Sequence, residues 1–165
     1  YFARYPASYR RFTPTCDEDD MHRCSHEALS NAYSNTIAYT DHIVAMLVDR
    51  LHQAEARGQY DAAALIYVSD HGESLGENGI YLHGIPRSVA PREQTDIPFI
   101  VWPSDGLKRR FGLDDRCLLD QAERGGYSHD NLFHTALGVL AITASRYRPD
   151  LNFFYPCEHP GFEAH

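Results

Sequence analysis

The sequence has no long hydrophobic run and is short of positive charge. Its longest clean apolar stretches are residues 62–68 and 136–142, far below the roughly 20 residues that a membrane-spanning helix needs. Fifteen Lys and Arg stand against 23 Asp and Glu, which gives a net charge of −8. This acidic balance argues against a nucleic-acid partner. It is compatible with phosphate chemistry at a metal site, because a bound dication inverts the local charge.

Internal repeats, low-complexity tracts and a recognisable signal peptide are also lacking. The length of 165 residues predicts about one domain, and a hydrophobic fraction of 43% is enough to build a core. The chain begins at Tyr1 without an initiator Met. We therefore expect it to be cut from a longer protein.

The sequence has only four cysteines, an even number. Cys16, Cys24, Cys117 and Cys157 allow two disulfides in three possible pairings. No C-x2-C pair is present, so the spacing is unusual for four zinc ligands. Cys16 and Cys24 flank an acidic, turn-like stretch and form a plausible disulfide staple, which indicates a compartment outside the cytosol.

Hydrophobic periodicity predicts alternating helices and strands. The predicted helices cover residues 25–57, 114–124 and 128–142, the predicted strands cover 62–68 and 97–102, and coil follows Pro149. Ser25 is a candidate N-cap of the first helix, and Ser128 or Asp130 of the last. The first helix has an apolar stripe typical of core packing, formed by Leu29, Tyr33, Ile37, Thr40, Val44, Leu47 and Leu51. The short apolar run 62–68 indicates a buried strand, and the order of elements predicts part of a layered α/β fold.

The candidate functional residues are concentrated in residues 69–84. This segment follows the first predicted strand and contains a glycine-rich loop. In open α/β sheets, ligands bind at the carboxyl ends of strands. Asp70 and His71 lie there and combine a carboxylate with an imidazole, a donor set that suits zinc. His83 could return to the same point across the glycine loop. The competing interpretation is a polar surface loop with ordinary histidines.

A second motif overlaps the first. The residues from Gly72 to Gly76 match G-x-S-x-G, the nucleophile elbow of serine hydrolases, with Ser74 as nucleophile. A triad could draw on Asp130 and His134. The glycines that follow Ser74 argue against it, because the elbow needs a helix directly after the serine.

These motifs resemble one family through most of the chain. The matching residues, in family order, are Tyr5-Pro6, Pro14-Thr15-Cys16-Asp17, Cys24-Ser25, Asn31-Ala32-Tyr33, Asn35-Thr36-Ile37, Tyr39-Thr40-Asp41, Ser69 through Gly84, Gln94-Thr95 with Pro98, and Tyr127 through Phe133. The sequence resembles the C-terminal half of the periplasmic catalytic domain of the lipid A phosphoethanolamine transferases, the colistin-resistance type. They belong to the alkaline phosphatase/sulfatase superfamily. The resemblance implies a layered α/β/α sheet flanked by helices, with residues 1–165 as the C-terminal portion of one sulfatase-like domain.

The resemblance also implies roles for individual residues. Asp70 and His71 would be ligands of the catalytic zinc. His83 would bind the phosphoethanolamine group or a second zinc, and Glu73 would lie near the substrate amine or the second metal. Cys16 and Cys24 match a disulfide of the family, and we infer that Cys117 pairs with Cys157.

The implied reaction is zinc-dependent transfer of phosphoethanolamine from phosphatidylethanolamine to a lipid A phosphate, at the periplasmic face of the Gram-negative inner membrane. In the family, the threonine nucleophile, a glutamate ligand and the membrane helices lie upstream of the matched region. We therefore expect the upstream half of the same domain as a partner. The alternatives are a non-catalytic piece without the nucleophile, or another phosphotransferase or hydrolase of the superfamily.

Overall fold

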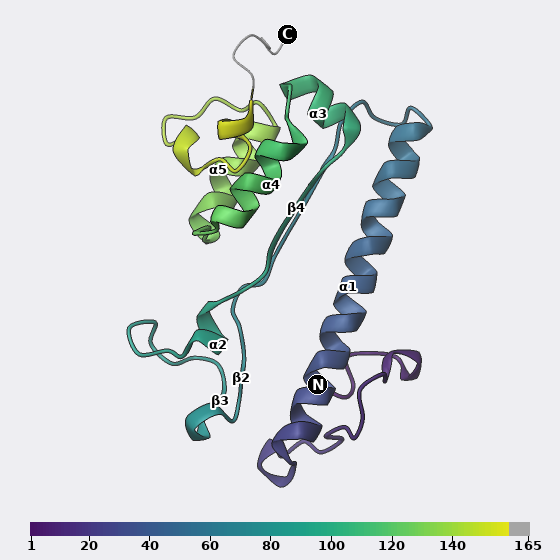
Figure 1. Ribbon diagram of the computed structural model, residues 1–165, viewed down its shortest axis with the longest axis vertical. Coiled ribbons are helices and arrows are strands. Elements are labelled where there is room, and N and C mark those ends of the chain that lie inside the picture. The colour runs from purple at the N-terminus through teal and green to yellow at the C-terminus, as the bar shows by residue number, and fades with distance from the viewer. Residues whose placement is uncertain (159–165) are drawn as a thin grey trace. The chain divides into compact units, whose positions relative to one another are not determined.

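The computed structural model describes residues 1–158 and divides the chain into two compact units (Figure 1). The first unit contains Tyr1–Leu47 and His71–Ile97, and the second contains Val48–Asp70 and the chain from Pro98 onward. The chain therefore passes from one unit to the other within the long helix α1, between Asp70 and His71, and between Ile97 and Pro98. No helix in the described part of the chain has the length and apolarity to cross a membrane.

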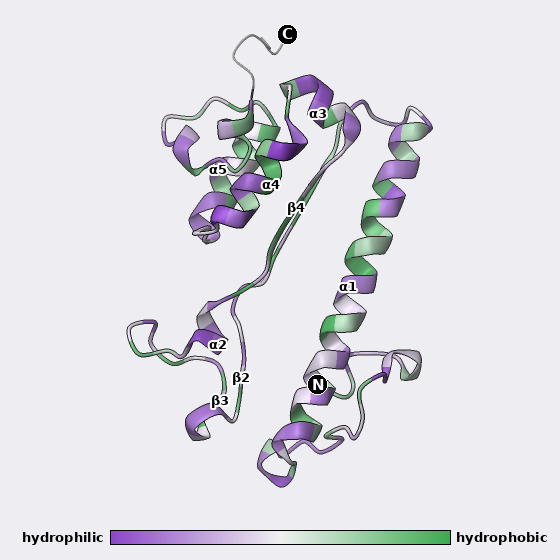
Figure 2. Cartoon of the chain, in the orientation of Figure 1, coloured by the Kyte–Doolittle hydropathy of each residue, from purple (hydrophilic) through white to green (hydrophobic). Residues whose placement is uncertain are grey.

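Helix α1 spans His26–Ala56, close to the predicted 25–57. Ser25 caps it as predicted, since its hydroxyl accepts a hydrogen bond from the Ala28 amide at 3.2 Å. The apolar stripe continues along the middle of the helix (Figure 2), but the prediction that all of it is core is wrong. Leu29 is buried, whereas Ile37 and Leu47 are 50% and 45% exposed. Within the described residues, the core covers only the first turns of α1.

The core of the first unit gathers around a disulfide. Cys16 and Cys24 are bonded as predicted, and Cys16 packs with Ala28, Leu29 and the β2 residue Leu75. The segment before α1 was expected to be loop and contains only two 3-10 turns, Ala7–Tyr9 and Met21–Arg23. This core therefore joins the N-terminal loop, the start of α1 and the glycine-rich segment.

The glycine-rich segment is more ordered than the sequence predicted. Strands β2 (Ser74–Leu75) and β3 (Tyr81–Leu82) form a small antiparallel hairpin. The short helix α2 (Arg92–Thr95) follows and was not predicted. Because β2 and β3 are paired, the residues just before β2 and just after β3 lie at the open end of the hairpin. His71 and His83 are among these residues.

The second unit is built on two antiparallel strands. Strand β1 (Ala64–Val68) pairs with β4 (Phe99–Pro103), with Ala64 opposite Pro103 and Val68 opposite Phe99. The predicted burial of the first strand is wrong, because every residue of β1 is only partly buried. In the described chain β1 pairs only with β4, so the two strands form a narrow sheet.

Three capped helices complete the second unit. Helix α3 (Asp105–Phe111) was not predicted, while α4 (Asp115–Arg124) was. Helix α5 (His129–Val139) begins after Ser128 as predicted but ends before residue 142. Its end comes early because Ala141 adopts a left-handed backbone, with φ of 52°.

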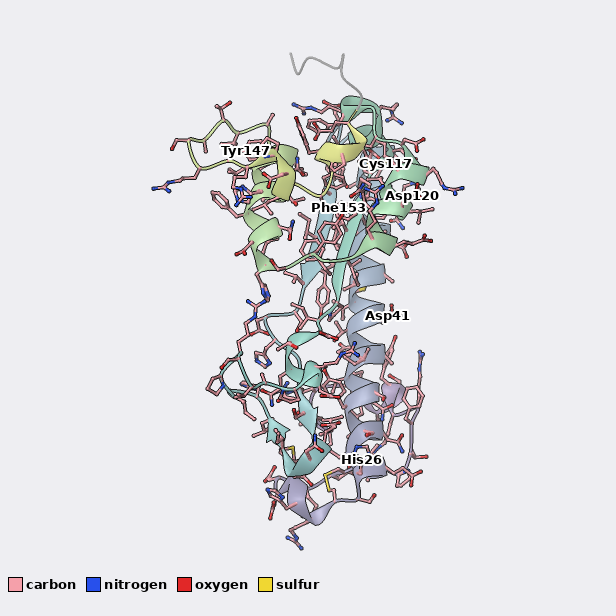
Figure 3. The ribbon with its side chains drawn as sticks, turned by 60° about the vertical axis from the view of Figure 1, so that its left-hand side comes forward. His26, Asp41, Cys117, Asp120, Tyr147 and Phe153 are labelled. Atoms are coloured by element: carbon pink, nitrogen blue, oxygen red, sulfur yellow. A yellow bond between two sulfur atoms is a disulfide. The ribbon has the colours of Figure 1, made fainter. Side chains whose placement is uncertain are left out.

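The C-terminal segment is better ordered than the coil that was predicted. It forms two 3-10 turns, Pro149–Leu151 and Tyr155–Cys157. Phe153 is buried in the core of this unit, and Cys117 forms the predicted disulfide with Cys157 (Figure 3). The segment is held because its aromatic side chains and its cysteine are part of the core.

Candidate metal centre

A close backbone contact in the first unit fixes the start of the glycine-rich segment. The Gly72 amide donates to the carbonyl of Gln94 at 3.0 Å. A side chain at position 72 would collide with the carbonyl of Glu93. Only glycine fits against this part of α2, and the contact fixes the backbone between His71 and Glu73.

The His71 ring is oriented by the backbone that follows it. Its Nδ1 atom lies 2.8 Å from the carbonyl oxygen of Gly72. A carbonyl can only accept, so we assign the ring proton to Nδ1. The lone pair then lies on Nε2, which is the state in which an imidazole binds a metal ion.

His83 is oriented in the same way by a carboxylate. Its Nδ1 lies 3.0 Å from Oε1 of Glu73, across the hairpin. The ring centroids of His71 and His83 are 3.7 Å apart, with the planes 31° from parallel. The Glu73 side chain is only 11% exposed, while that of His83 is 49% exposed. The pair therefore combines an enclosed carboxylate with a solvent-accessible imidazole.

These residues fit a divalent metal ion by their chemistry and their spacing. His71, Glu73 and His83 each offer a ligand atom, and these atoms lie within 4.8 Å of one another. Imidazole nitrogen and carboxylate oxygen are suitable donors for zinc. The structure thus joins His71 and His83 as the loop spacing predicted. It adds Glu73, which was expected only from the family resemblance.

Asp70, the other predicted zinc ligand, directly precedes His71 and belongs to the second unit. Its side chain is exposed. Its assignment as a zinc ligand stays a prediction.

The serine-nucleophile interpretation is wrong. Ser74 is fully buried, at 0% exposure, and its hydroxyl accepts a hydrogen bond from Nε2 of Gln94 at 2.9 Å. The strand β2 that carries it runs into Gly76, with φ of 115°, and no α-helix follows directly. His134 is buried on α5, where its Nδ1 accepts from the Arg148 amide at 3.1 Å. Ser74 and His134 therefore both have structural partners.

One residue near the cluster was missed by sequence reasoning. The Tyr1 hydroxyl is buried in the first unit. Burial, followed by the charge of Glu73, raises the pKa of the Tyr1 phenol above its usual range. No sequence signal could have identified it, because Tyr1 lies in an aromatic loop segment without periodicity.

Comparisons with known proteins find similar sequences and similar structures. The family model described as Sulfatase matches residues 1–142. Phosphoethanolamine transferase EptA of Escherichia coli (strain K12) is 41% identical over 157 residues, which are 95% of this chain and 28% of that protein.

Two solved structures are similar over nearly the whole chain. The first is the soluble domain of lipooligosaccharide phosphoethanolamine transferase A from Neisseria meningitidis. It has a TM-score of 0.88 and 38% identity, over 96% of this chain and 47% of that one. The second is the C-terminal periplasmic domain of phosphoethanolamine transferase EptC from Campylobacter jejuni. It has a TM-score of 0.77 and 40% identity, over 99% of this chain and 48% of that one. The α/β fold is therefore confirmed as that of part of such a domain.

Proposed function

Because the chain belongs to the Sulfatase family, we propose that it carries part of the metal and substrate site of a phosphoethanolamine transferase. The reaction is zinc-dependent transfer of phosphoethanolamine from phosphatidylethanolamine to a lipid A phosphate. The observation that carries this proposal is the cluster of His71, Glu73 and His83, whose ligand atoms lie within 4.8 Å of one another.

The similar proteins support the choice of transferred group and acceptor. The relatives from E. coli, N. meningitidis and C. jejuni are all named phosphoethanolamine transferases. The meningococcal protein is named for lipooligosaccharide. This chain spans 28% of the E. coli relative, so the proposal includes the upstream half of the same domain as a partner.

Each residue of the site has a distinct task in this proposal. Asp70 and His71 hold the zinc ion, with Nε2 of His71 oriented by the Gly72 carbonyl. Bound zinc neutralises charge on phosphoryl oxygens and lowers the pKa of a hydroxyl nucleophile. Glu73 holds the Nδ1 proton of His83. The Nε2 atom of His83 then carries the lone pair. It can accept a proton or a hydrogen bond from the phosphoethanolamine group.

The proposed place of action is the periplasmic face of the inner membrane. The C. jejuni structure is named as a periplasmic domain, and both predicted disulfides are formed. Disulfides persist in oxidising compartments such as the periplasm. Contact with the membrane would come from the N-terminal helices that the family resemblance implies.

The test is Asp70→Ala in the intact protein. Transfer from a phosphatidylethanolamine analogue should be abolished while the melting temperature is retained, because the side chain of Asp70 is exposed. Asp120→Ala is the matched control, since Asp120 is an exposed carboxylate of the same unit that pairs with Arg116 on the surface. Wild-type activity in Asp70→Ala would refute the proposed role.

A further inference from the structure

A histidine side chain in the second unit joins the end of β1 to the start of α5. Nε2 of His129 lies 2.8 Å from the carbonyl oxygen of Ser69, the residue that directly follows β1, and 60 positions separate the two. A carbonyl can only accept, so Nε2 carries the proton and donates. Nε2 is also a donor in the charged imidazolium. The contact is therefore available to the neutral and to the charged ring alike.

This hydrogen bond acts on the peptide group that leads into Asp70. The Ser69 carbonyl and the Asp70 amide belong to one planar peptide unit, which also contains the Cα atom of Asp70. On its other side, the Ser69 amide donates to the Pro98 carbonyl at 3.4 Å, next to β4. Ser69 is thus held from two sides, by β4 and by α5. Its carbonyl contact orients the Cα atom from which the Asp70 side chain projects.

The histidine is itself anchored by the capped start of α5. His129 is the first residue of the helix and follows the N-cap Ser128. The Ser128 amide donates to the Asn131 side chain at 2.9 Å, as part of a capping box. Asn131 is buried, and its side-chain amide donates to the Leu151 carbonyl at 3.0 Å. The imidazole therefore projects from a backbone that is fixed before it reaches Ser69.

We propose that His129 is a positioning residue for the metal site, whose Nε2–H group holds the Ser69 carbonyl and thereby fixes the backbone that presents Asp70. The inference rests on the proposed function, in which Asp70 is a zinc ligand. His129 acts through the backbone and is not a ligand. Loss of an outer group that orients a metal ligand typically lowers metal affinity or activity about 10-fold to 100-fold. Because a peptide unit lies between His129 and Asp70, we expect the lower end, about 10-fold.

Two substitutions separate the donor atom from the rest of the ring. In His129→Gln, the amide nitrogen lies as many bonds from the backbone as Nε2 does, so it can still donate to the Ser69 carbonyl. In His129→Asn, the amide nitrogen corresponds to Nδ1 and is one bond too near the backbone to reach. The pair therefore keeps an amide donor at position 129 and changes only where it lies.

The first test is the zinc affinity of the intact, metal-stripped protein, measured by competition with a chelator. The dissociation constant should rise about 10-fold in His129→Asn and stay near the wild-type value in His129→Gln. His52→Asn, at an exposed histidine on α1 in the same unit, should leave it unchanged. A tether that only supports the fold would lower the melting temperature of His129→Asn and leave its zinc affinity intact. That result, or equal losses of zinc affinity in the Gln and Asn variants, would overturn the positioning role.

Transfer provides a second readout and separates this inference from the proposed function. His129→Asn should lower kcat about 10-fold with little change in KM, while His129→Gln should keep the wild-type kcat. An unchanged kcat in His129→Asn would also overturn the positioning role. Failure of the proposed function looks different. In that case the wild-type protein would show no transfer, while the zinc affinities of the Gln and Asn variants would still differ.

Discussion

The Nδ1 atom of His83 lies 3.0 Å from Oε1 of Glu73, although ten positions separate the two residues in the chain. The β2–β3 hairpin makes this contact possible. The contact orients His83 before any ligand arrives, which reduces the ordering cost of binding.

Replacement of Glu73 by Gln should lower transfer. The amide keeps the shape of the side chain but loses the charge that holds the Nδ1 proton of His83. We expect kcat to fall about 10-fold to 100-fold, measured with a phosphatidylethanolamine analogue as donor. Glu93→Gln, an exposed carboxylate of the same unit on α2, is the control. Equal activity in the two variants would contradict the role of Glu73.

Gly72→Ala should disturb both stability and the site. The added Cβ would collide with the Glu93 carbonyl, and overpacking of this kind typically costs about 1–3 kcal/mol. Zinc affinity should fall as well, because the Gly72 carbonyl orients His71. Calorimetry and zinc titration measure the two effects.

Gly79→Ala is the matched control for Gly72→Ala. Its Cβ would meet open space, but its backbone φ is +75°, so it should lose about 1–2 kcal/mol through left-handed strain. Its zinc affinity should be unchanged. A loss of zinc binding in Gly79→Ala equal to that in Gly72→Ala would show that general loosening, rather than the Gly72 contact, is responsible.

Ser74→Ala should leave transfer unchanged and reduce stability. The substitution deprives Nε2 of the buried Gln94 of its acceptor, and an unsatisfied buried group costs about 1–3 kcal/mol. A fluorophosphonate probe should not label the wild-type protein at Ser74. Labelling at this residue would reinstate a serine nucleophile.

Removal of the two disulfides should have unequal effects. The Cys117–Cys157 bond links residues 40 apart in sequence and Cys16–Cys24 links residues 8 apart. In the chain-entropy description, the stabilisation is about 4 kcal/mol for the longer loop and about 2.5 kcal/mol for the shorter. Paired Cys→Ala variants and denaturant titration would measure both. A larger loss from the shorter loop would indicate that its effect is mainly through packing against α1.

Acid should remove a stabilising contact in the second unit. The Glu55 carboxylate accepts from the Ser104 hydroxyl at 2.7 Å and from the Gly106 amide at 2.8 Å. The Ser104 hydrogen bond, followed by that of Gly106, lowers the pKa of Glu55 from 4.5. Folding therefore favours the ionised form, and its contribution is full above pH 4.5 and is lost as the pH falls through the lowered pKa.

The corresponding variant is Glu55→Gln. Its melting temperature should be below that of the wild type at neutral pH, and the difference should shrink as the pH falls below 4.5. Glu123→Gln, an exposed carboxylate on α4, should show no such convergence. A constant difference across the pH range would mean that the Glu55 charge is not what stabilises α3.

Local features of the chain were determined by the amino-acid sequence alone. The cap at Ser25 and the periodic pattern after it specify α1, and the cap at Ser128 starts α5, because these signals act within a few residues. The motif from Ser69 to Gly84 was specific enough to identify the family. It also marked His71 and His83 as neighbours across a turn.

Only the tertiary structure decided which of these features are buried and which residues meet. Ile37 and Leu47 of the apolar stripe on α1 are exposed, Ser74 is buried against Gln94, and Phe153 enters the core from a segment without periodicity. The contact of Glu73 with His83 and the burial of the Tyr1 hydroxyl depend on hydrogen bonds and packing between distant segments. Such contacts leave no periodic trace in the sequence, because they are set by how the hairpin and the N-terminal loop pack against the first turns of α1.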